Sequence, residues 1–383
     1  MKRIALLVLF ALAPALAGAQ QPMPPTLPFE SIPSPLKLPP DMNFGEIAGV
    51  AVDSKKNVYV FSRGNSSGPS YMATAAQLLQ FDANGKFVRE IGKNLYAWSY
   101  AHAVRIDKQD NIWVVDKGSD MIVKFNQEGH VEWVFGRKGE ASHYQVPPDT
   151  GATLAGLLRR AGVEVNPPTP NVARNPVPVH QDGYFNQPTD VAFDAQGNSY
   201  FSDGYINSRV AKASNRGDWL ASWGSLGNGP GQFDTPHGVA IAPNGEVYVA
   251  DRGNRRIQVL DQSGKFLRQF TIDVPVPADA KAAIGVPPVN LTTGSMAPGA
   301  PDAICITPGA NPVLFAADLY PGRVYKLSLD GKVLGVYGKS GKNLGEFGWV
   351  HAIACPSENE IYVGELLNWR VQKLVTKRTA QSR

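Results

Sequence analysis

The sequence predicts an all-β fold in the form of a six-bladed β-propeller. One phrase of alternating apolar residues and turns recurs six times along the chain. Each copy spans about 40 to 50 residues and accommodates four strands, which is typical of a propeller blade. The chain also has 38 glycines and 31 prolines among 383 residues, an excess that favours many turns.

Each copy begins with an apolar strand, turns at Asp, Asn and Gly, and returns as a second strand. Strict alternation in VYVF, IWVV and VYVA indicates strands, whereas D-A-Q-G-N and P-N-G indicate hairpin turns. A third strand follows, as in RIQVLDQSGKFLRQF, and a fourth comes after one more turn. The copies lie at 49–65, 103–119, 190–209, 238–256, 303–323 and 352–370.

The propeller is expected to occupy residues 44–378, after a segment at 20–43. The sixth copy ends near Val375 with only three strands, so a strand from elsewhere must cover its open edge. We expect Ser34–Leu38, within residues 30–40, to supply that strand and close the ring. Proline-rich insertions at 137–182 and 271–297 are either loops over one mouth of the ring that contribute to function, or tolerated padding.

Residues 1–19 have the features of a secretory signal peptide. Lys2 and Arg3 precede an apolar run, and Ala17-Gly18-Ala19 forms a small-residue cleavage site. A membrane anchor is the alternative, but the apolar run is shorter than the ~20 residues that span a bilayer, and Pro14 interrupts it. We therefore expect a soluble periplasmic or secreted protein with no membrane anchor.

Composition narrows the classes of partner. Hydrophobic residues at 43% and charged residues at 18% suffice for a large core, which excludes disorder over most of the chain. The net charge of +4 is too balanced for a nucleic-acid partner or an anionic membrane surface. Cys305 and Cys355 are compatible with a disulfide in an oxidising compartment or with a buried pair of thiols.

The start of each innermost strand faces the central channel of a propeller. The residues at this position in the six copies are therefore candidate site residues. They are Ala48, His102, Asp190, His237, Asp302 and His351. The three histidines come from alternate copies and would lie about 120° apart around the axis. Three imidazoles that leave a fourth direction open are typical of a catalytic zinc site, whereas isolated channel histidines usually have a structural role. Asp190 and Asp302 would orient the imidazoles, hold a harder metal ion, or satisfy amides at strand ends.

A second tier lies where the second strand of each copy returns to the same mouth. It comprises Arg63, Asp116, Asp203, Asp251, Asp318 and Glu365. The acids are expected mostly to cap the turns that follow them. Arg63 replaces an acid, and Arg252 and Tyr205 follow the acids of their copies, so these three are candidates for binding an anionic substrate and for proton transfer. The alternative for each is a water-exposed rim residue.

Several motifs resemble the peptidyl-α-hydroxyglycine α-amidating lyase family, a branch of the NHL-repeat propellers. They are Phe185-Asn-Gln-Pro-Thr-Asp-Val-Ala, Ser202-Asp-Gly-Tyr-Ile-Asn-Ser-Arg209, Gly229-Pro-Gly-Gln-Phe-Asp-Thr-Pro-His237 and Val249-Ala-Asp-Arg252. The resemblance implies that His102, His237 and His351 bind zinc, that Tyr205 is the catalytic tyrosine, and that Arg63 and Arg252 bind substrate. A family aspartate that contributes to a structural calcium is Ala352 here, and a family cysteine is Ile206, so calcium is doubtful and that family disulfide is absent.

The resemblance further implies the activity: cleavage of an N-acyl or peptidyl α-hydroxyglycine, either a small molecule or a peptide with that C-terminal residue, to a primary amide and glyoxylate. Two alternatives remain. One is a non-catalytic propeller that binds a protein or glycan across its rim, and the other is a metal-dependent hydrolase on the same ring.

Overall fold

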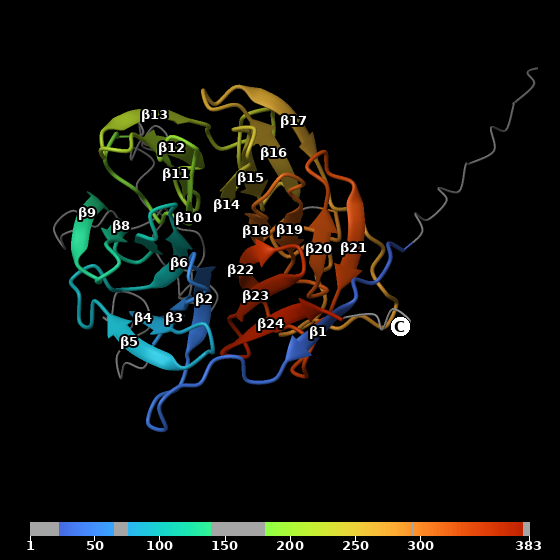
Figure 1. The fold of residues 1–383 in the computed structure, drawn as a ribbon. Helices are drawn as coiled ribbons and strands as arrows, with labels where there is room; N and C mark the ends of the chain where they lie inside the picture. The colour runs from blue at the N-terminus through green and yellow to red at the C-terminus, as the bar shows by residue number, and fades with distance from the viewer. Residues whose placement is uncertain (1–22, 65–75, 139–180, 293, 378–383) are drawn as a thin grey trace, which may run out of the picture.

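The computed structural model describes residues 23–64, 76–138, 181–292 and 294–377, and within them it contains strands, turns and no helix. Twenty-four strands form six four-stranded antiparallel sheets arranged around a central axis (Figure 1). The predicted six-bladed β-propeller is therefore confirmed. The signal peptide expected at 1–19 lies outside the described residues.

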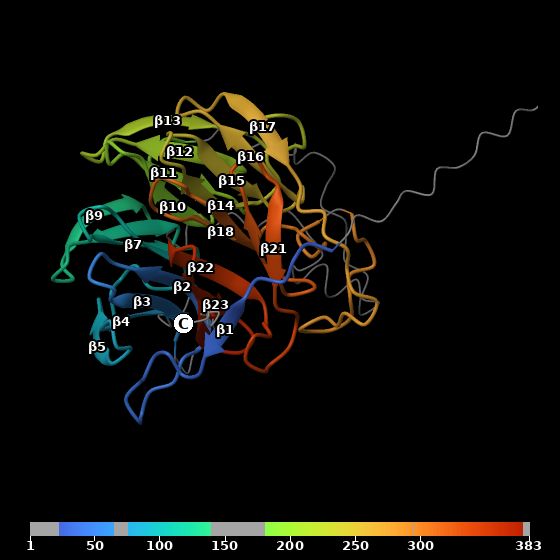
Figure 2. The same ribbon diagram turned by 45° about the vertical axis from the view of Figure 1, so that its right-hand side comes forward.

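The blades follow one another along the chain, and each runs from an inner strand outward (Figures 1 and 2). Blade 1 contains β2 (Glu46–Val52), β3 (Val58–Arg63), β4 (Ala76–Phe81) and β5 (Phe87–Ile91); blade 2 contains β6 (Ala101–Ile106), β7 (Ile112–Asp116), β8 (Met121–Phe125) and β9 (Val131–Gly136). Blade 3 contains β10 (Asp190–Phe193), β11 (Ser199–Asp203), β12 (Arg209–Ala213) and β13 (Trp219–Trp223); blade 4 contains β14 (Pro236–Ile241), β15 (Val247–Asp251), β16 (Arg256–Leu260) and β17 (Phe266–Phe270). Blade 5 contains β18 (Ala303–Ile306), β19 (Leu314–Ala317), β20 (Val324–Leu327) and β21 (Val333–Tyr337); blade 6 contains β22 (Val350–Ser357), β23 (Glu360–Glu365), β24 (Arg370–Thr376) and β1 (Phe29–Ile32).

The turns between the first two strands of a blade are shaped by aspartate. In blade 1, Asp53 Oδ1 accepts hydrogen bonds from the backbone N–H groups of Lys55 and Asn57 at 2.9 and 2.8 Å. Asp107 and Asp194 make the same pair of bonds in blades 2 and 3. An aspartate that satisfies turn amides in this way favours a tight hairpin, which explains why the repeat phrase carries Asp at that position.

The N-terminal segment closes the ring, but with different residues from those expected. Strand β1 pairs antiparallel with β24, from Phe29 opposite Thr376 to Ile32 opposite Lys373, and lies against the last blade in Figures 1 and 2. The prediction that Ser34–Leu38 forms this strand is wrong. That stretch contains Pro35, which has no N–H to donate, and its Leu36 instead packs into the core of blade 1 beside Val58 and Phe81.

Cys305 and Cys355 form a disulfide, with their Cα atoms 6.2 Å apart. The bond joins β18 to β22 and so links the fifth and sixth blades near the point of ring closure. Because the loop it closes spans 50 residues, the chain-entropy contribution of such a crosslink is about 4 kcal/mol.

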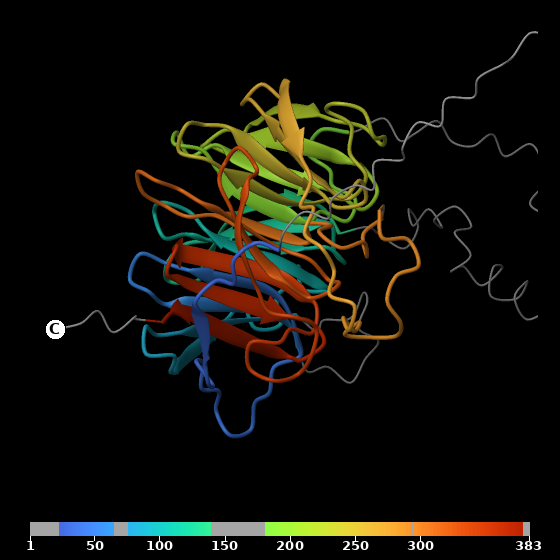
Figure 3. The ribbon, with the colours of Figure 1, turned by 90° about the vertical axis from the view of Figure 1, so that its right-hand side faces the viewer.

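The second insertion, 271–297, borders the mouth that holds the candidate site. Its Gly294 N–H donates to the carbonyl of Gly253, which follows β15, at 3.2 Å. The carboxylate of Asp273 forms an ion pair with Arg255, with 2.7 Å between Oδ1 and Nη2. The gold and orange segment after β17 extends from one face of the ring in Figure 3. The first insertion, 137–182, lies almost entirely outside the described residues, and no described helix is long and apolar enough to cross a membrane.

Candidate metal centre

Three buried histidines meet on the axis, one each from the inner strands β6, β14 and β22. At each of them the pairing with the second strand shifts register, between Ala101 and Ala103, between Pro236 and Gly238, and between Val350 and Ala352. A β-bulge takes the intervening residue out of the ladder and redirects its side chain. The bulges therefore explain why His102, His237 and His351 turn toward the channel.

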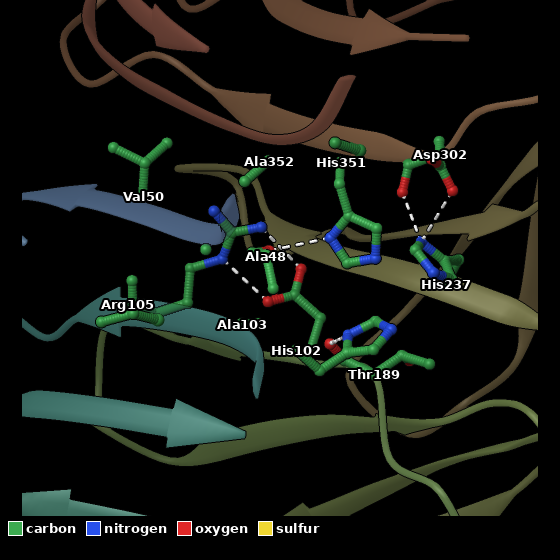
Figure 4. Close-up of a pocket in the computed structure, with 14 residues that line it drawn as sticks. Ala48, Val50, His102, Ala103, Arg105, Thr189, His237, Asp302, His351 and Ala352 are labelled. Carbon is green, nitrogen blue, oxygen red and sulfur yellow. Dashed lines mark hydrogen bonds and ion pairs between the residues drawn. The ribbon is translucent and has the colours of Figure 1, made fainter. Parts of the chain in front are cut away.

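The next blade fixes the orientation of each ring. The Nδ1 atoms of His102 and His237 lie 2.6 Å from the carbonyl oxygens of Thr189 and Asp302, and Nδ1 of His351 lies 2.8 Å from that of Ala48. Because a carbonyl only accepts, each Nδ1 carries the hydrogen and each Nε2 offers a lone pair. Figure 4 shows the three imidazoles converging with these contacts behind them.

The imidazoles are close together and neutral. Their ring centroids are 4.6, 4.8 and 5.0 Å apart. Burial lowers the pKa of all three, and for His351 the value falls to about 4. Within the described residues they form a group of potential ligands whose ligand atoms all lie within 4.8 Å of one another. Neutral, carbonyl-anchored imidazoles are the ligands that zinc prefers, so this donor set fits a divalent metal.

Tyr205 lies directly over this centre. Its hydroxyl is 3.1 Å from Nε2 of His237 and 3.4 Å from Nε2 of His102. The D-G-Y-I-N-S-R motif explains this position, because Asp203 accepts hydrogen bonds from Asn207 Nδ2 at 2.6 Å and from Arg209 Nε at 3.0 Å. These bonds tie the two ends of the turn between β11 and β12 together and present Tyr205 to the channel.

The two predicted arginines also reach this mouth, and each is held by an acid. Arg63 pairs with Glu46 at 2.6 Å, and its guanidinium lies 3.9 Å above the ring of Tyr100. Arg252 pairs with Asp302 at 2.6 Å, and its guanidinium carbon is 5.5 Å from the centre of the Tyr205 ring. The structure therefore brings Tyr205, Arg63 and Arg252 to the same side of the three histidines.

Asp302 and Asp190, which were expected to have similar roles, have different ones. Burial alone would raise the pKa of Asp302, but the nearby Nδ1–H of His237 and the guanidinium of Arg252 outweigh it and lower the pKa to about 2. Asp302 thus supports His237, whose Nδ1 is 3.2 Å from its carboxylate. Asp190 instead binds Arg105 through two bonds of 2.8 and 2.7 Å, below the histidines in the channel.

The five acids of the second tier form hydrogen bonds with the backbone. Asp116, Asp203, Asp251, Asp318 and Glu365 each accept a hydrogen bond from an N–H in the segment that leads into the inner strand of the same blade, at 2.7 to 3.0 Å. The acids therefore stabilise the entry to the inner strands of blades 2 to 6. Asp116 and Asp318 also cap the turns that follow them, as expected, because they accept hydrogen bonds from the N–H groups of Gly118 and Ser119 and of Gly322 and Arg323.

Sequence reasoning missed three residues of this mouth. Lys117 follows the acid of blade 2 just as Arg252 follows the acid of blade 4, so its position was an available signal. Its ammonium lies 3.7 Å from the centre of the Tyr205 ring. Tyr100 and Trp349 each lie two residues before a histidine, and Trp349 Nε1 donates to the carboxylate of Asp302.

Calcium does not fit the channel below the histidines. Ala352 lines the cavity in this part of the channel and offers no side-chain oxygen. The carboxylate oxygens of Asp190, which could otherwise bind a cation, accept hydrogen bonds from the guanidinium of Arg105. Besides Asp190, Arg105 Nη1 donates to the carbonyl of Ile353 at 3.1 Å. Hard cations need several oxygen ligands, and here an arginine already binds them.

Comparisons with known proteins show which sequences and folds this chain resembles. The NHL repeat family matches residues 233–260, which cover the end of the loop into β14 through β16. The chain is 29% identical over 248 residues to the mouse peptidyl-glycine alpha-amidating monooxygenase, a match that covers 59% of this chain and 22% of that protein. It is 25% identical over 369 residues to the Drosophila melanogaster peptidyl-alpha-hydroxyglycine alpha-amidating lyase 1, covering 89% of this chain and 59% of that one.

The chain thus spans about a fifth of the monooxygenase that it matches. Among solved structures, a gluconolactonase from Xanthomonas campestris aligns with a TM-score of 0.52 and 13% identity over 94% of this chain and 99% of that one, which shows the fold alone. The expected resemblance is confirmed: this chain is a six-bladed β-propeller that matches the NHL repeat at residues 233–260, and its sequence is similar to the peptidyl-α-hydroxyglycine α-amidating lyases.

Proposed function

We propose that this protein is an exported, zinc-dependent lyase that cleaves an N-acyl or peptidyl α-hydroxyglycine to a primary amide and glyoxylate. One observation carries the proposal: the Tyr205 hydroxyl lies within 3.4 Å of the metal-facing nitrogens of two histidines. A proton acceptor beside a metal site suits a reaction that begins at a hydroxyl group. The name of the Drosophila relative states the same reaction class. Export rests on the leader-like residues 1–19.

The residues at this mouth of the ring have separate roles in the proposed reaction. When bound by the three histidines, zinc supplies Lewis acidity to a substrate oxygen. In its deprotonated form, Tyr205 would accept the proton of the substrate hydroxyl and hold it for the leaving nitrogen. Arg63 and Arg252 orient the carboxylate through the N–H groups that face away from their acid partners. The carbon–nitrogen bond then breaks, its electron pair moves to nitrogen, and nitrogen takes up a proton. The hydroxyl-bearing carbon becomes the aldehyde of glyoxylate, so no oxidant or reductant is consumed.

Product identity tests this proposal. Zinc-loaded protein should convert N-benzoyl-α-hydroxyglycine to benzamide and glyoxylate in equal amounts, above the rate of a reaction without protein. Both products can be quantified by chromatography. A hydrolase acting on the amide bond would release benzoate instead, and a pure binding module would release nothing. Either result would overturn the assignment.

A further inference from the structure

Counting only the residues that the structure describes, positive charge at this mouth exceeds negative charge, and the surplus lies on Lys117. Arg63 and Arg252 each pair with a carboxylate at 2.6 Å. Among the described residues, the Lys117 ammonium has no such ion pair. It lies instead between two aromatic rings, 3.7 Å from the centre of Tyr205 and 5.4 Å from that of Tyr100. The same two rings contact Arg252 and Arg63, so the three cations cluster around Tyr100 and Tyr205.

This position is costly for a cation. Burial, followed by the like charges of Arg252 and Arg63, lowers the pKa of Lys117 to about 8. The ammonium therefore stays protonated at neutral pH in a place that disfavours it. Contacts with the two rings offset part of the cost, but an uncharged side chain of the same length would pack there without repulsion. A charge retained against its own stability is typical of a binding site that awaits an anion.

We propose that Lys117 binds the carboxylate of the substrate and makes this site selective for anionic substrates. The inference deepens the function proposed above and rests on it. Arg63 and Arg252, held by Glu46 and Asp302, set the orientation of the carboxylate, whereas Lys117 contributes the one uncompensated charge among them. Because Lys117 also lies against Tyr205, a carboxylate bound there brings the adjoining carbon next to the tyrosine and the histidines.

Binding of an unreactive analogue separates this inference from the reaction. N-Benzoylglycine has the carboxylate but lacks the hydroxyl, and N-benzoylglycinamide lacks both the charge and the hydroxyl. Their dissociation constants would be measured by calorimetry on zinc-loaded wild type, Lys117→Met and Lys117→Arg. Lys332→Met, the same substitution at an exposed lysine in the hairpin between β20 and β21, is the matched control.

Lys117→Met should weaken N-benzoylglycine binding roughly 10- to 100-fold, as loss of a charged hydrogen bond does, and leave N-benzoylglycinamide binding unchanged. Lys117→Arg should retain most of the affinity, and Lys332→Met all of it. Equal losses for both analogues, unchanged binding of the acid, or no binding of the acid to wild type would each overturn the inference. Lysine-dependent binding of the acid without turnover of N-benzoyl-α-hydroxyglycine would keep the lysine assignment and remove the proposed reaction.

Discussion

Different local structures position Tyr205 and the three histidines. A network of Asp203, Asn207 and Arg209 shapes the turn that carries the tyrosine, and β-bulges redirect the histidines. The turn that carries Tyr205 and the bulges that carry the histidines belong to different blades. A substitution can therefore remove the tyrosine hydroxyl without disturbing the imidazoles. A substitution at Tyr205 should therefore report on chemistry rather than on metal binding.

Tyr205→Phe removes one oxygen and should leave folding and zinc content intact. If the hydroxyl is the proton acceptor, kcat for glyoxylate release should fall by about 10² to 10⁴. Steady-state kinetics alongside elemental analysis would check both statements. Unchanged kcat at full zinc content would remove Tyr205 from the mechanism.

Lys117 should affect stability in the direction opposite to its effect on binding. It faces Arg63, Arg252, Tyr100, Tyr205 and, at longer range, His102. Its pKa of about 8 in the folded protein lies below the ordinary value of 10.5, so the unfolded chain binds more protons between these two values. The penalty for the ammonium is full below pH 8 and fades as the pH rises toward 10.5.

Lys117→Met should consequently raise Tm at pH 7, and the gain should shrink by pH 10. Thermal unfolding of both proteins at the two pH values tests this, because the other titrating groups are common to both. A Tm that falls in the variant at pH 7 would show that Lys117 stabilises the fold and would contradict the account of its cost.

Much of this site could be predicted at the residue scale, because the repeat places His102, His237 and His351 at one phase of the inner strands. Lys117 could not be assigned in the same way. Its importance depends on Glu46 and Asp302 neutralising the two arginines. Arg63 and Glu46 face each other across one strand pair, but Arg252 and Asp302 meet only when blades 4 and 5 pack together.

At the scale of elements, the least predictable strand was the one that closes the ring. Both Phe29–Ile32 and Ser34–Leu38 are short, mixed segments flanked by proline, and only Pro35 inside the second one argues locally against a strand there. Tertiary packing does: Phe29 is buried against Phe315 and Tyr337, with ring centroids 6.2 and 5.8 Å away. The second strands β3, β7 and β15 were easier to predict, because the VYVF, IWVV and VYVA segments mark them directly.

Phe29→Ala should lower the free energy of unfolding by about 3–5 kcal/mol, since it leaves a cavity where the last blade meets blade 5. Glu30→Ala changes the exposed neighbour on the same strand and should cost far less. Denaturant unfolding of the two variants would compare them. Equal, small effects would indicate that β1 does not close the ring through its core contacts.

At the scale of the whole molecule, Arg105 joins inner strands of several blades. From β6 it reaches Asp190 in β10 and the carbonyl of Ile353 in β22, beneath the histidines. An arginine in this position supplies the central cation from the chain itself. Stability should therefore not depend on added calcium.

Millimolar calcium should leave Tm of the wild type unchanged, whereas Arg105→Met should lower stability by about 3 kcal/mol or more, because the buried Asp190 would lose its cationic partner. Arg268→Met, which breaks the more exposed pair with Glu246, is the control and should cost about 1 kcal/mol or less. A calcium-dependent rise in Tm of the wild type would contradict this account of the channel.

The central claim is that one divalent metal on the axis, held by His102, His237 and His351, is required for lyase turnover. Titrating metal-stripped protein with zinc while following glyoxylate release from N-benzoyl-α-hydroxyglycine tests it most directly. The rate should rise linearly and level off near one equivalent of zinc, and His351→Ala should show neither the rise nor the break. Full turnover by the stripped protein, or a wild-type rate that zinc does not change, would contradict the claim.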